Sequence, residues 1–265
     1  MRRLVNKRRL WLIGGTGEAV ALARALAIRE IPCLVTLTTA AARDSYGRRQ
    51  NLEVEVGSLP VDALPAFIQA KGIGAILDAS HPFAVVISQG AIAAAQNLAI
   101  PYWRYERPLV ADLGSQVGLR HVSDLNSVFR ADLLAGQRVL LTLGYRWLAA
   151  FQPWQSQATL FARILPSPGA LTAALTAGFS PDRLIALRPP IGAELETALW
   201  RQWGITTVIT KASGQAGGEQ VKQRVAQILG IPLIIIDRPP VEYPLVSHSL
   251  EELLALVETW WKFQN

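Results

Sequence analysis

The sequence predicts an α/β protein of two lobes, each with a mainly parallel sheet that is covered by helices on both faces. Short apolar runs typical of buried strands alternate with longer segments in which apolar residues recur at helical spacing. This alternation fills the first half of the 265 residues and restarts in the second half. We expect an N-terminal lobe of residues 1–115 and a C-terminal lobe of residues 116–265, since a chain of this length can bury two cores.

The first lobe is expected to contain four strands and three helices. Its strands are predicted at residues 10–13, 33–38, 75–79 and 101–105, and its helices at residues 18–29, 61–71 and 83–97. In the second lobe the strands are predicted at residues 138–143, 159–165, 184–187, 207–210 and 233–236. Its helices are predicted at residues 169–177, 193–203, 219–229 and 250–263.

The composition excludes several classes of protein. Half of the residues are hydrophobic and 17% are charged, which argues against a disordered chain. No apolar run approaches the roughly 20 residues of a membrane-spanning helix, and the apolar stretch after the basic start is shorter than the roughly 7–15 residues of a secretory signal. Cys33 is the only cysteine, which favours a reducing, cytoplasmic location and a core position for its thiol. One cysteine and three histidines are too few for a structural zinc site, so no metal is expected.

The formal charge of +6 does not indicate nucleic-acid binding. Four arginines and one lysine of this excess lie in the first nine residues, and the other cations are dispersed without interleaved aromatic residues. An anionic small molecule accounts for the charge equally well. We expect a monomer or a weak homo-oligomer that binds such a ligand.

Binding sites in folds of this kind lie beyond the carboxyl ends of the strands. The first strand is followed by Gly14, Gly15, Thr16, Gly17 and Glu18, where a tight turn can approach a pyrophosphate at a helix N-terminus. We expect a dinucleotide here, held by Gly14, Gly15, Thr16 and Glu18. A purely structural turn remains the alternative, because the usual third glycine is absent.

The second strand is followed by Thr38, Thr39 and Arg43, with no acidic residue before Asp44. At this position an acidic residue favours NADH, whereas hydroxyls and an arginine suit the 2′-phosphate of NADPH. NADPH is therefore the expected cofactor, with NADH possible. A solvated polar loop would explain the same residues.

The third strand ends in Asp78-Ala79-Ser80-His81-Pro82. Pro82 suits the first position of a helix, and Ser80 is a candidate helix cap and ligand contact. His81 is a candidate catalytic residue, although isolated histidines are more often structural.

In the second half, strand ends carry hydroxyls, glycines and cations. They include Thr142, Gly144 and Tyr145 after one strand, and Ser213 and Gly214 after another. Four strands each supply a cation to the same expected edge, which predicts a cleft for a polyanion. These cations are Arg146, Arg163, Arg188 and Lys211.

Five blocks in this order resemble the precorrin-6A reductase family. They are Gly14-Gly15-Thr16-x-Glu18, the block from Asp78 to Ala84, the block from Pro101 to Pro108, Thr142-x-Gly144, and Thr210-Lys211-x-Ser213-Gly214. The segment from Leu229 to Pro240 also fits. Gly17 and the loose threonine–glycine–arginine turn at residues 142–146 depart from the family pattern.

The resemblance implies two Rossmann-like lobes and the reduction of one double bond of precorrin-6A, or of its cobalt-bound form, by a reduced nicotinamide cofactor in the pathway to vitamin B12. It also implies that Ser80, His81, Thr142, Gly144, Ser213 and Gly214 contact the cofactor. The carboxylate arms of the tetrapyrrole suit the expected cations. The proton that accompanies the hydride could come from Lys211, His81, Tyr145 or a water.

Two other functions are alternatives for a chain with Rossmann-like lobes. A short-chain dehydrogenase would need Tyr-x-x-x-Lys, and none of the five tyrosines has a lysine four residues on. A non-catalytic protein that binds tetrapyrroles or nucleotides would not oxidise NAD(P)H when a macrocycle is supplied.

Overall fold

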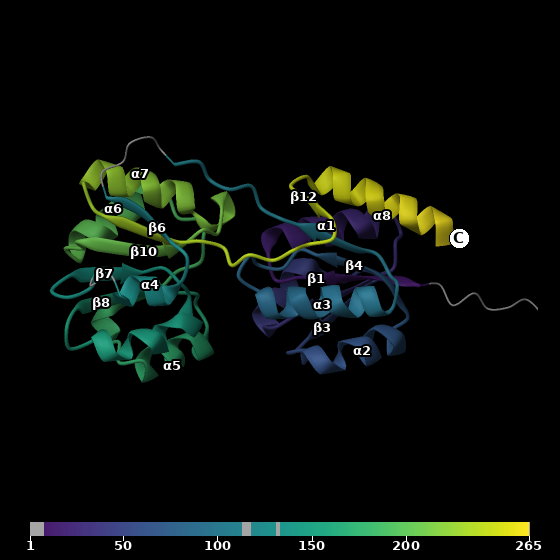
Figure 1. Cartoon of the computed structure of the whole chain (residues 1–265), viewed down its shortest axis with the longest axis horizontal. Coiled ribbons are helices and arrows are strands. Elements are labelled where there is room, and N and C mark those ends of the chain that lie inside the picture. The colour runs from purple at the N-terminus through teal and green to yellow at the C-terminus, as the bar shows by residue number, and fades with distance from the viewer. Residues whose placement is uncertain (1–7, 113–117, 131–132, 265) are drawn as a thin grey trace, which may run out of the picture. The chain divides into compact units, whose positions relative to one another are not determined.

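The computed structural model describes residues 8–112, 118–130 and 133–264. The chain forms two compact units, drawn in Figure 1. Unit 1 comprises Met1–Arg107 and Pro240–Asn265, and unit 2 comprises Pro108–Pro239. The expected boundary between residues 115 and 116 lies outside the described residues, as does most of the basic start.

Unit 1 contains a parallel sheet of six described strands in the order β12-β5-β4-β1-β2-β3. The strands are β1 (Arg9–Ile13), β2 (Cys33–Leu37), β3 (Leu52–Val56), β4 (Ile73–Asp78), β5 (Tyr102–Tyr105) and β12 (Val246–Ser247). The helices are α1 (Gly17–Ile28), α2 (Leu64–Ala70), α3 (Val85–Asn97) and α8 (Leu250–Gln264), with 3₁₀ turns η1 (Ala40–Tyr46) and η2 (Val61–Ala63).

Alternate side chains of β1 face two different helical layers. Leu10 and Leu12 pack in a core with α1 and α8, whereas Trp11 and Ile13 pack in a core with α2 and α3. This alternation is what a strand with two buried faces requires, and it explains the continuous apolar run from residue 10 to residue 13.

The C-terminal segment belongs to the first unit, which differs from the expected division of the chain. Val246 in β12 pairs with Arg104 in β5, so β12 covers an edge of the first sheet. Leu253 and Val257 of α8 lie in the same core as Leu22 of α1. Alternation of strands and helices along a sequence cannot show that the last helix returns to an earlier sheet.

Unit 2 contains a second parallel sheet, with six described strands in the order β6-β11-β10-β7-β8-β9. These strands are β6 (Leu119–Val122), β7 (Arg138–Leu141), β8 (Thr159–Ile164), β9 (Leu184–Ala186), β10 (Thr207–Lys211) and β11 (Leu233–Ile236). The helices are α4 (Leu125–Arg130), α5 (Pro168–Thr176), α6 (Ala193–Gln202) and α7 (Glu219–Leu229), with 3₁₀ segments η3 (Tyr145–Trp154), η4 (Pro181–Arg183) and η5 (Gln215–Gly217).

Five strands of each sheet share one connectivity, whereas the sixth described strand is β12, near the end of the chain, in unit 1 and β6, which precedes β7, in unit 2. In unit 1 the strand order turns back between β1 and β4, and in unit 2 it turns back between β7 and β10. Loops at such a switch point are the usual binding site of an open parallel sheet. The loops that follow β1, β4, β7 and β10 are those that the sequence marks as functional. The predicted fold class, two Rossmann-like lobes with parallel sheets, is confirmed.

Three described strands, β3, β6 and β12, were not expected. In β3 the glutamates at positions 53 and 55 interrupt the apolar run, and they pair with Arg9 and Lys71 rather than marking a loop. Pro82 does not open a helix, because residues 82 and 83 form a turn and α3 begins at Val85.

Candidate active site

The turn after β1 uses its glycines in two ways. At Gly14 a Cβ would lie 2.6 Å from the Tyr46 hydroxyl and 2.9 Å from side chains of Leu37 and Val35, so packing excludes a side chain. Gly15 has a φ of +101°, which favours glycine, and no other atom lies within 4 Å of the position its Cβ would take. The Gly15 amide donates to Tyr46 Oη at 3.0 Å. Tyr46 therefore supports a turn that stays open at Gly15.

Thr16 and Glu18 lie at the start of α1, and both side chains have partners. Thr16 Oγ1 donates to the Ala79 carbonyl at 2.7 Å and accepts from the Ala19 amide at 3.1 Å, so it caps α1 and ties it to the end of β4. Glu18 accepts two hydrogen bonds from Arg107, at 2.7 and 2.8 Å. Burial acts to raise the pKa of Glu18, but Arg107 outweighs burial and lowers it.

These contacts give both side chains a structural role at the start of α1. Direct binding of a dinucleotide by Thr16 and Glu18 stays a prediction. The first amides of a helix have no carbonyl partner within it, so the backbone of this turn keeps the capacity to bind an anion.

The segment after β2 is exposed. Thr38, Thr39 and Arg43 all have high solvent exposure, and Arg43 lies on η1, which also carries the supporting Tyr46. These three residues follow the carboxyl end of β2, and their contact with a cofactor stays a prediction.

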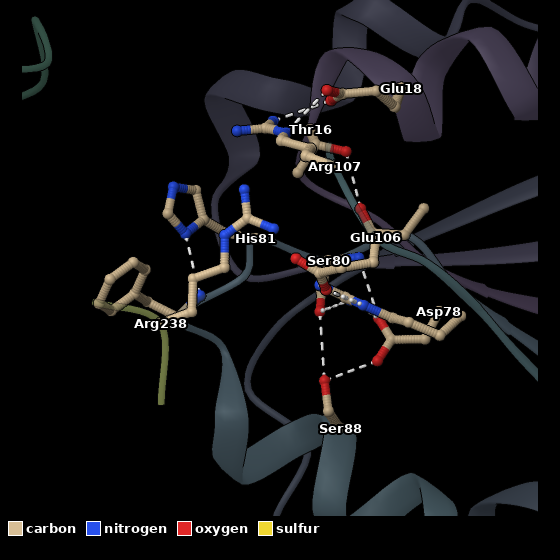
Figure 2. A network of polar contacts seen from close by, with 12 residues as sticks. Thr16, Glu18, Asp78, Ser80, His81, Ser88, Glu106, Arg107 and Arg238 are labelled. Atoms are coloured by element: carbon tan, nitrogen blue, oxygen red, sulfur yellow. Dashed lines mark hydrogen bonds and ion pairs between the residues drawn. The ribbon is translucent and has the colours of Figure 1, made fainter. Parts of the chain in front are cut away.

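A buried network of charges joins the ends of β4 and β5 (Figure 2). Asp78 is fully buried, and its Oδ1 accepts from the Ser80 amide at 2.9 Å and from Arg104 at 3.0 Å. Its Oδ2 accepts from the hydroxyls of Ser88 and Tyr102, both at 2.6 Å. Burial and the charge of Asp78 raise the pKa of Tyr102, so its hydroxyl keeps the proton that it donates.

Arg104 is as buried as Asp78 and satisfies its charge with two carboxylates. Its Nε donates to Glu106 at 2.9 Å, and its Nη1 also donates to Ser80 Oγ at 3.1 Å. Burial acts to lower the pKa of Arg104, but Asp78 and Glu106 outweigh it and raise the pKa. The network therefore holds Ser80 through both its amide and its hydroxyl.

His81 is the next residue in the chain after Ser80. Its Nδ1 accepts a hydrogen bond from the Phe83 amide at 3.2 Å, and its ring lies 5.9 Å from the Phe83 ring. An imidazole that accepts at Nδ1 carries its proton on Nε2 when it is neutral. His81 is thus oriented with its donor nitrogen directed away from its own turn.

In unit 2 the loop after β7 carries Thr142, Gly144, Tyr145 and Arg146. Thr142 Oγ1 donates to the Ile209 carbonyl at 3.2 Å, which joins the ends of β7 and β10. Gly144 has a φ of +80° and precedes η3, which begins at Tyr145. Arg146 is exposed, with its guanidinium 5.8 Å from the centroid of the Tyr145 ring.

Lys211 is the last residue of β10 and lies close to this loop. Its Nζ is 5.4 Å from the centroid of the Trp147 ring. Burial, together with the like charge of Arg146, lowers the pKa of Lys211 to about 8. An ammonium with such a pKa can release a proton near neutral pH, which an ordinary lysine does not do readily.

The loop after Lys211 contains Ser213 and Gly214. The Ser213 amide donates to the Lys211 carbonyl at 2.7 Å, and the Ser213 side chain is buried. Gly214 has a φ of +75°, and its amide donates to Glu219 at 2.8 Å. The structure therefore brings Lys211, Ser213 and Gly214 together in one tight loop, as the sequence predicts.

The four cations expected to bind substrate do not all lie at the carboxyl edge. Arg146, Arg188 and Lys211 lie at or beyond the ends of their strands, and Arg188 is exposed. Arg163 lies within β8 and pairs with Glu196 of α6. Its side chain is therefore used inside unit 2, which removes it from the predicted cationic edge.

Several residues of the site carry no signal that the sequence analysis used. Tyr46 has no motif around it, and Glu219 and Lys222 resemble ordinary polar residues at a helix start. Asp78 and Arg104 stand in the quoted motifs, but only the structure shows that they pair.

Two further findings bear on the class of protein. Within residues 8–112, 118–130 and 133–264, no helix has the length and apolar character needed to cross a membrane. In the same part of the chain, no three His, Cys, Asp or Glu side chains gather as a metal site would require.

Comparison with known proteins agrees with this geometry. The family described as "Precorrin-6x reductase CbiJ/CobK" matches residues 9–258. The chain belongs to this family. A cobalt-precorrin-6A reductase of Synechocystis sp. is 50% identical over 92% of this chain and 94% of its own length, and one of Priestia megaterium is 34% identical over 93% and 97%. A solved structure named "CobK precorrin-6A reductase" matches with a TM-score of 0.79 and 28% identity, over 95% of this chain and 97% of its own.

Membership of the precorrin-6x reductase family confirms the resemblance drawn from the sequence blocks. It makes the chain an oxidoreductase and removes support from the non-catalytic alternative. The match covers both units, so neither lobe is an addition to the family architecture.

Proposed function

We propose that this chain reduces one double bond of cobalt-precorrin-6A in cobalamin biosynthesis, with a reduced nicotinamide cofactor as hydride donor. Family membership over both units carries the proposal. The relatives that are 50% and 34% identical are named cobalt-precorrin-6A reductases, which makes the cobalt-bound macrocycle the first substrate to test, with the cobalt-free form as comparison.

The residues around the first switch point fit a dinucleotide. Gly15 leaves open space at a backbone position with positive φ, and the helix that follows offers the amides of its first turn. Tyr46 and Thr16 hold this turn, and Ser80 and His81 lie on the loop after the neighbouring β4. When bound, the reduced nicotinamide ring supplies the hydride.

For the cofactor we propose NADPH. Thr38, Thr39 and Arg43 lie beyond the end of β2, and an arginine with hydroxyl groups suits a 2′-phosphate. Asp44, the first acidic residue after β2, comes after Arg43 on η1. NADH remains the comparison in every binding experiment.

For the substrate we propose contacts at the carboxyl edge of the second sheet. The acetate and propionate arms of the macrocycle are carboxylates, and Arg146, Arg188 and Lys211 lie at this edge. Thr142, Gly144, Ser213 and Gly214 lie in the loops of this edge, and we propose them as contacts of the cofactor. Lys211 is also our candidate for the proton donor through Nζ, because its lowered pKa lets the ammonium release a proton near neutral pH. His81 through Nε2 and Tyr145 through its hydroxyl are the alternatives.

The cellular setting is part of the same proposal. We place the enzyme in the cytoplasm as a monomer or weak homo-oligomer that binds neither nucleic acid nor membrane. The single cysteine, Cys33, is buried in the core of unit 1, and burial raises the pKa of its thiol to about 12, so it is protected from oxidation.

The test is oxidation of NADPH with cobalt-precorrin-6A present or absent, compared between the wild type and Gly15→Val. A side chain at Gly15 would fill the open space and strain a φ of +101°. We expect macrocycle-dependent oxidation in the wild type and at least about tenfold weaker NADPH binding in the variant. Macrocycle-independent oxidation would contradict the reaction, and a folded Gly15→Val protein with unchanged NADPH affinity would place the cofactor elsewhere.

A further inference from the structure

The loop between β10 and α7 is held from one side by two buried ionisable residues of the first turn of α7. Glu219 Oε2 accepts from the Gly214 amide at 2.8 Å, and Lys222 Nζ donates to the Gly217 carbonyl at 2.7 Å. Both residues are at most 2% exposed. Being three positions apart on a helix, they lie on one face and reach the two ends of the same short loop.

The path of this loop leaves little room for other arrangements. A Cβ at Gly217 would lie 1.9 Å from Ser213 Oγ and 2.5 Å from Ser213 Cβ, so the Ser213 side chain lies directly over the Gly217 backbone. Gly214 and Gly218 both have positive φ, at +75° and +70°. The position of Ser213 is therefore set by the backbone that Glu219 and Lys222 hold.

Stability does not explain why these two buried residues are polar. Burying a carboxyl group and an amine costs free energy, and a positive charge in the first turn of a helix opposes the helix dipole. A second pair of ionisable side chains is buried close to Lys222: Arg163 pairs with Glu196. Glu196 Oε2 also accepts a hydrogen bond from Trp200 Nε1 at 3.0 Å. Apolar residues would fill the space between β8, α6 and α7 at lower cost.

We propose that Glu219 and Lys222 are positioning residues for the reduction, which act by fixing the loop that follows Lys211 and carries Ser213. The inference rests on the proposed function, because it requires those two residues to take part in the reaction. Neither Glu219 nor Lys222 is proposed to touch cofactor or substrate.

The test compares Glu219→Ala, Glu219→Gln and Lys222→Met with Arg224→Met, which removes an exposed cation from the same helix. Three quantities are measured in each protein: exchange of the Gly214 amide, thermal stability, and kcat and KM with NADPH and cobalt-precorrin-6A. A glutamine at position 219 keeps an oxygen that can accept from Gly214, so it is the conservative rescue.

We expect Glu219→Ala to speed exchange of the Gly214 amide at least about tenfold and to lower kcat about 10- to 100-fold with KM nearly unchanged. Lys222→Met should lower kcat to a similar extent without lowering the melting temperature. Glu219→Gln and Arg224→Met should stay within about twofold of the wild type in kcat. A merely structural pair would instead lose stability and activity together.

Two outcomes would overturn the proposal. If Gly214 exchange is unchanged in Glu219→Ala, the carboxyl group does not hold the loop. If exchange rises while kcat is unchanged, the loop is held but its position does not serve the reaction. Failure of the proposed function is distinguishable from both outcomes, because the wild type itself would then show no NADPH oxidation that depends on cobalt-precorrin-6A.

Discussion

Five strands of each sheet follow the same order, yet corresponding loops carry different electrostatics. At the first switch point the buried Arg104 pairs with two carboxylates, the buried Asp78 and the partly buried Glu106. At the second switch point Lys211 lies beside Arg146, and burial and this like charge lower its pKa to about 8. In unit 1 these charged side chains bind one another and the backbone of the Ser80 loop. In unit 2 two cations, Lys211 and Arg146, lie close together at the carboxyl edge of the sheet.

This difference shows that the shared fold fixes where the loops lie, whereas side chains decide what each edge can bind. In unit 1 the amides and glycines of the β1 turn remain for a ligand because side chains such as Thr16 and Glu18 are tied back. In unit 2, Glu219 and Lys222 hold the backbone of the loop between β10 and α7 through hydrogen bonds to Gly214 and Gly217. The proposed function therefore relies on the backbone of the β1 turn in unit 1, whereas in unit 2 it relies on the side chains of Arg146, Arg188 and Lys211.

The largest expected effect on stability comes from removing Arg104 from the buried network of unit 1. Arg104→Met would leave the fully buried Asp78 without the guanidinium that pairs with it, and removing one partner of a buried pair costs about 3–5 kcal/mol. We expect the free energy of unfolding, measured in urea, to fall by that amount.

Arg9→Met is the matched control, because the Arg9–Glu53 pair of the same sheet is partly exposed. Exposed pairs contribute at most about 1 kcal/mol. An equal loss in both variants would mean that the Asp78–Arg104 network is no more important than a surface ion pair.

The next effect concerns the buried lysine of unit 2 and the pH dependence of stability. Burial, together with the charge of Arg163, lowers the pKa of Lys222 to about 7. In the unfolded chain the same amine holds its proton up to about pH 10.4. Between these values the unfolded state binds more protons, so this group makes folding more favourable as pH rises.

From pH 7 to pH 9 the contribution of Lys222 should amount to about 2 kcal/mol. Urea unfolding of the wild type and Lys222→Met at both pH values measures it, and the variant should lack that part of the increase. Arg224→Met should keep the whole increase. Identical pH dependence in the wild type and Lys222→Met would show that Lys222 is not desolvated as the structure indicates.

The sequence is sufficient for the fold class and for the loops that form the site. Apolar runs with two buried faces, such as residues 10–13, identify parallel strands, and the polar residues after them mark the switch points. It fails where a partner is distant in sequence. Nothing near residue 246 indicates that β12 pairs with β5, which lies about 140 residues earlier in the chain.

The sequence predicts where the loops of the site lie better than it predicts which partners their side chains bind. The turn alone identifies Gly15 as a position that favours glycine. A local motif predicts ligand contacts for Thr16 and Glu18, because it does not show their partners Ala79 and Arg107. The end of a strand predicts an edge cation at Arg163, because the local sequence does not show that α6 places Glu196 against it.

The third prediction tests whether the two edges bind different ligands. Arg43→Ala should weaken NADPH binding by about 1.5 kcal/mol, or roughly tenfold, through loss of a charge-assisted contact, and should leave NADH binding nearly unchanged. Titration of both cofactors measures this difference. Arg120→Ala, which removes an exposed arginine of unit 2, serves as the charge control. Equal weakening of both cofactors would place Arg43 away from the 2′-phosphate.

The smallest expected effect is on the proton donor itself. If the Lys211 ammonium supplies the proton, kcat/KM should fall as pH rises through about 8, since that parameter reports groups of the free enzyme. Lys211→Met should remove this limb of the profile. Arg146→Met should move it upward by less than about one pH unit, because burial is the larger cause of the lowered pKa and remains in the variant. Arg188→Met removes another exposed cation at the end of a strand of the same sheet and should leave the limb in place. A limb that stays at the same pH in Arg146→Met and persists in Lys211→Met would assign the proton to His81, Tyr145 or water, and would leave the second edge with substrate binding alone.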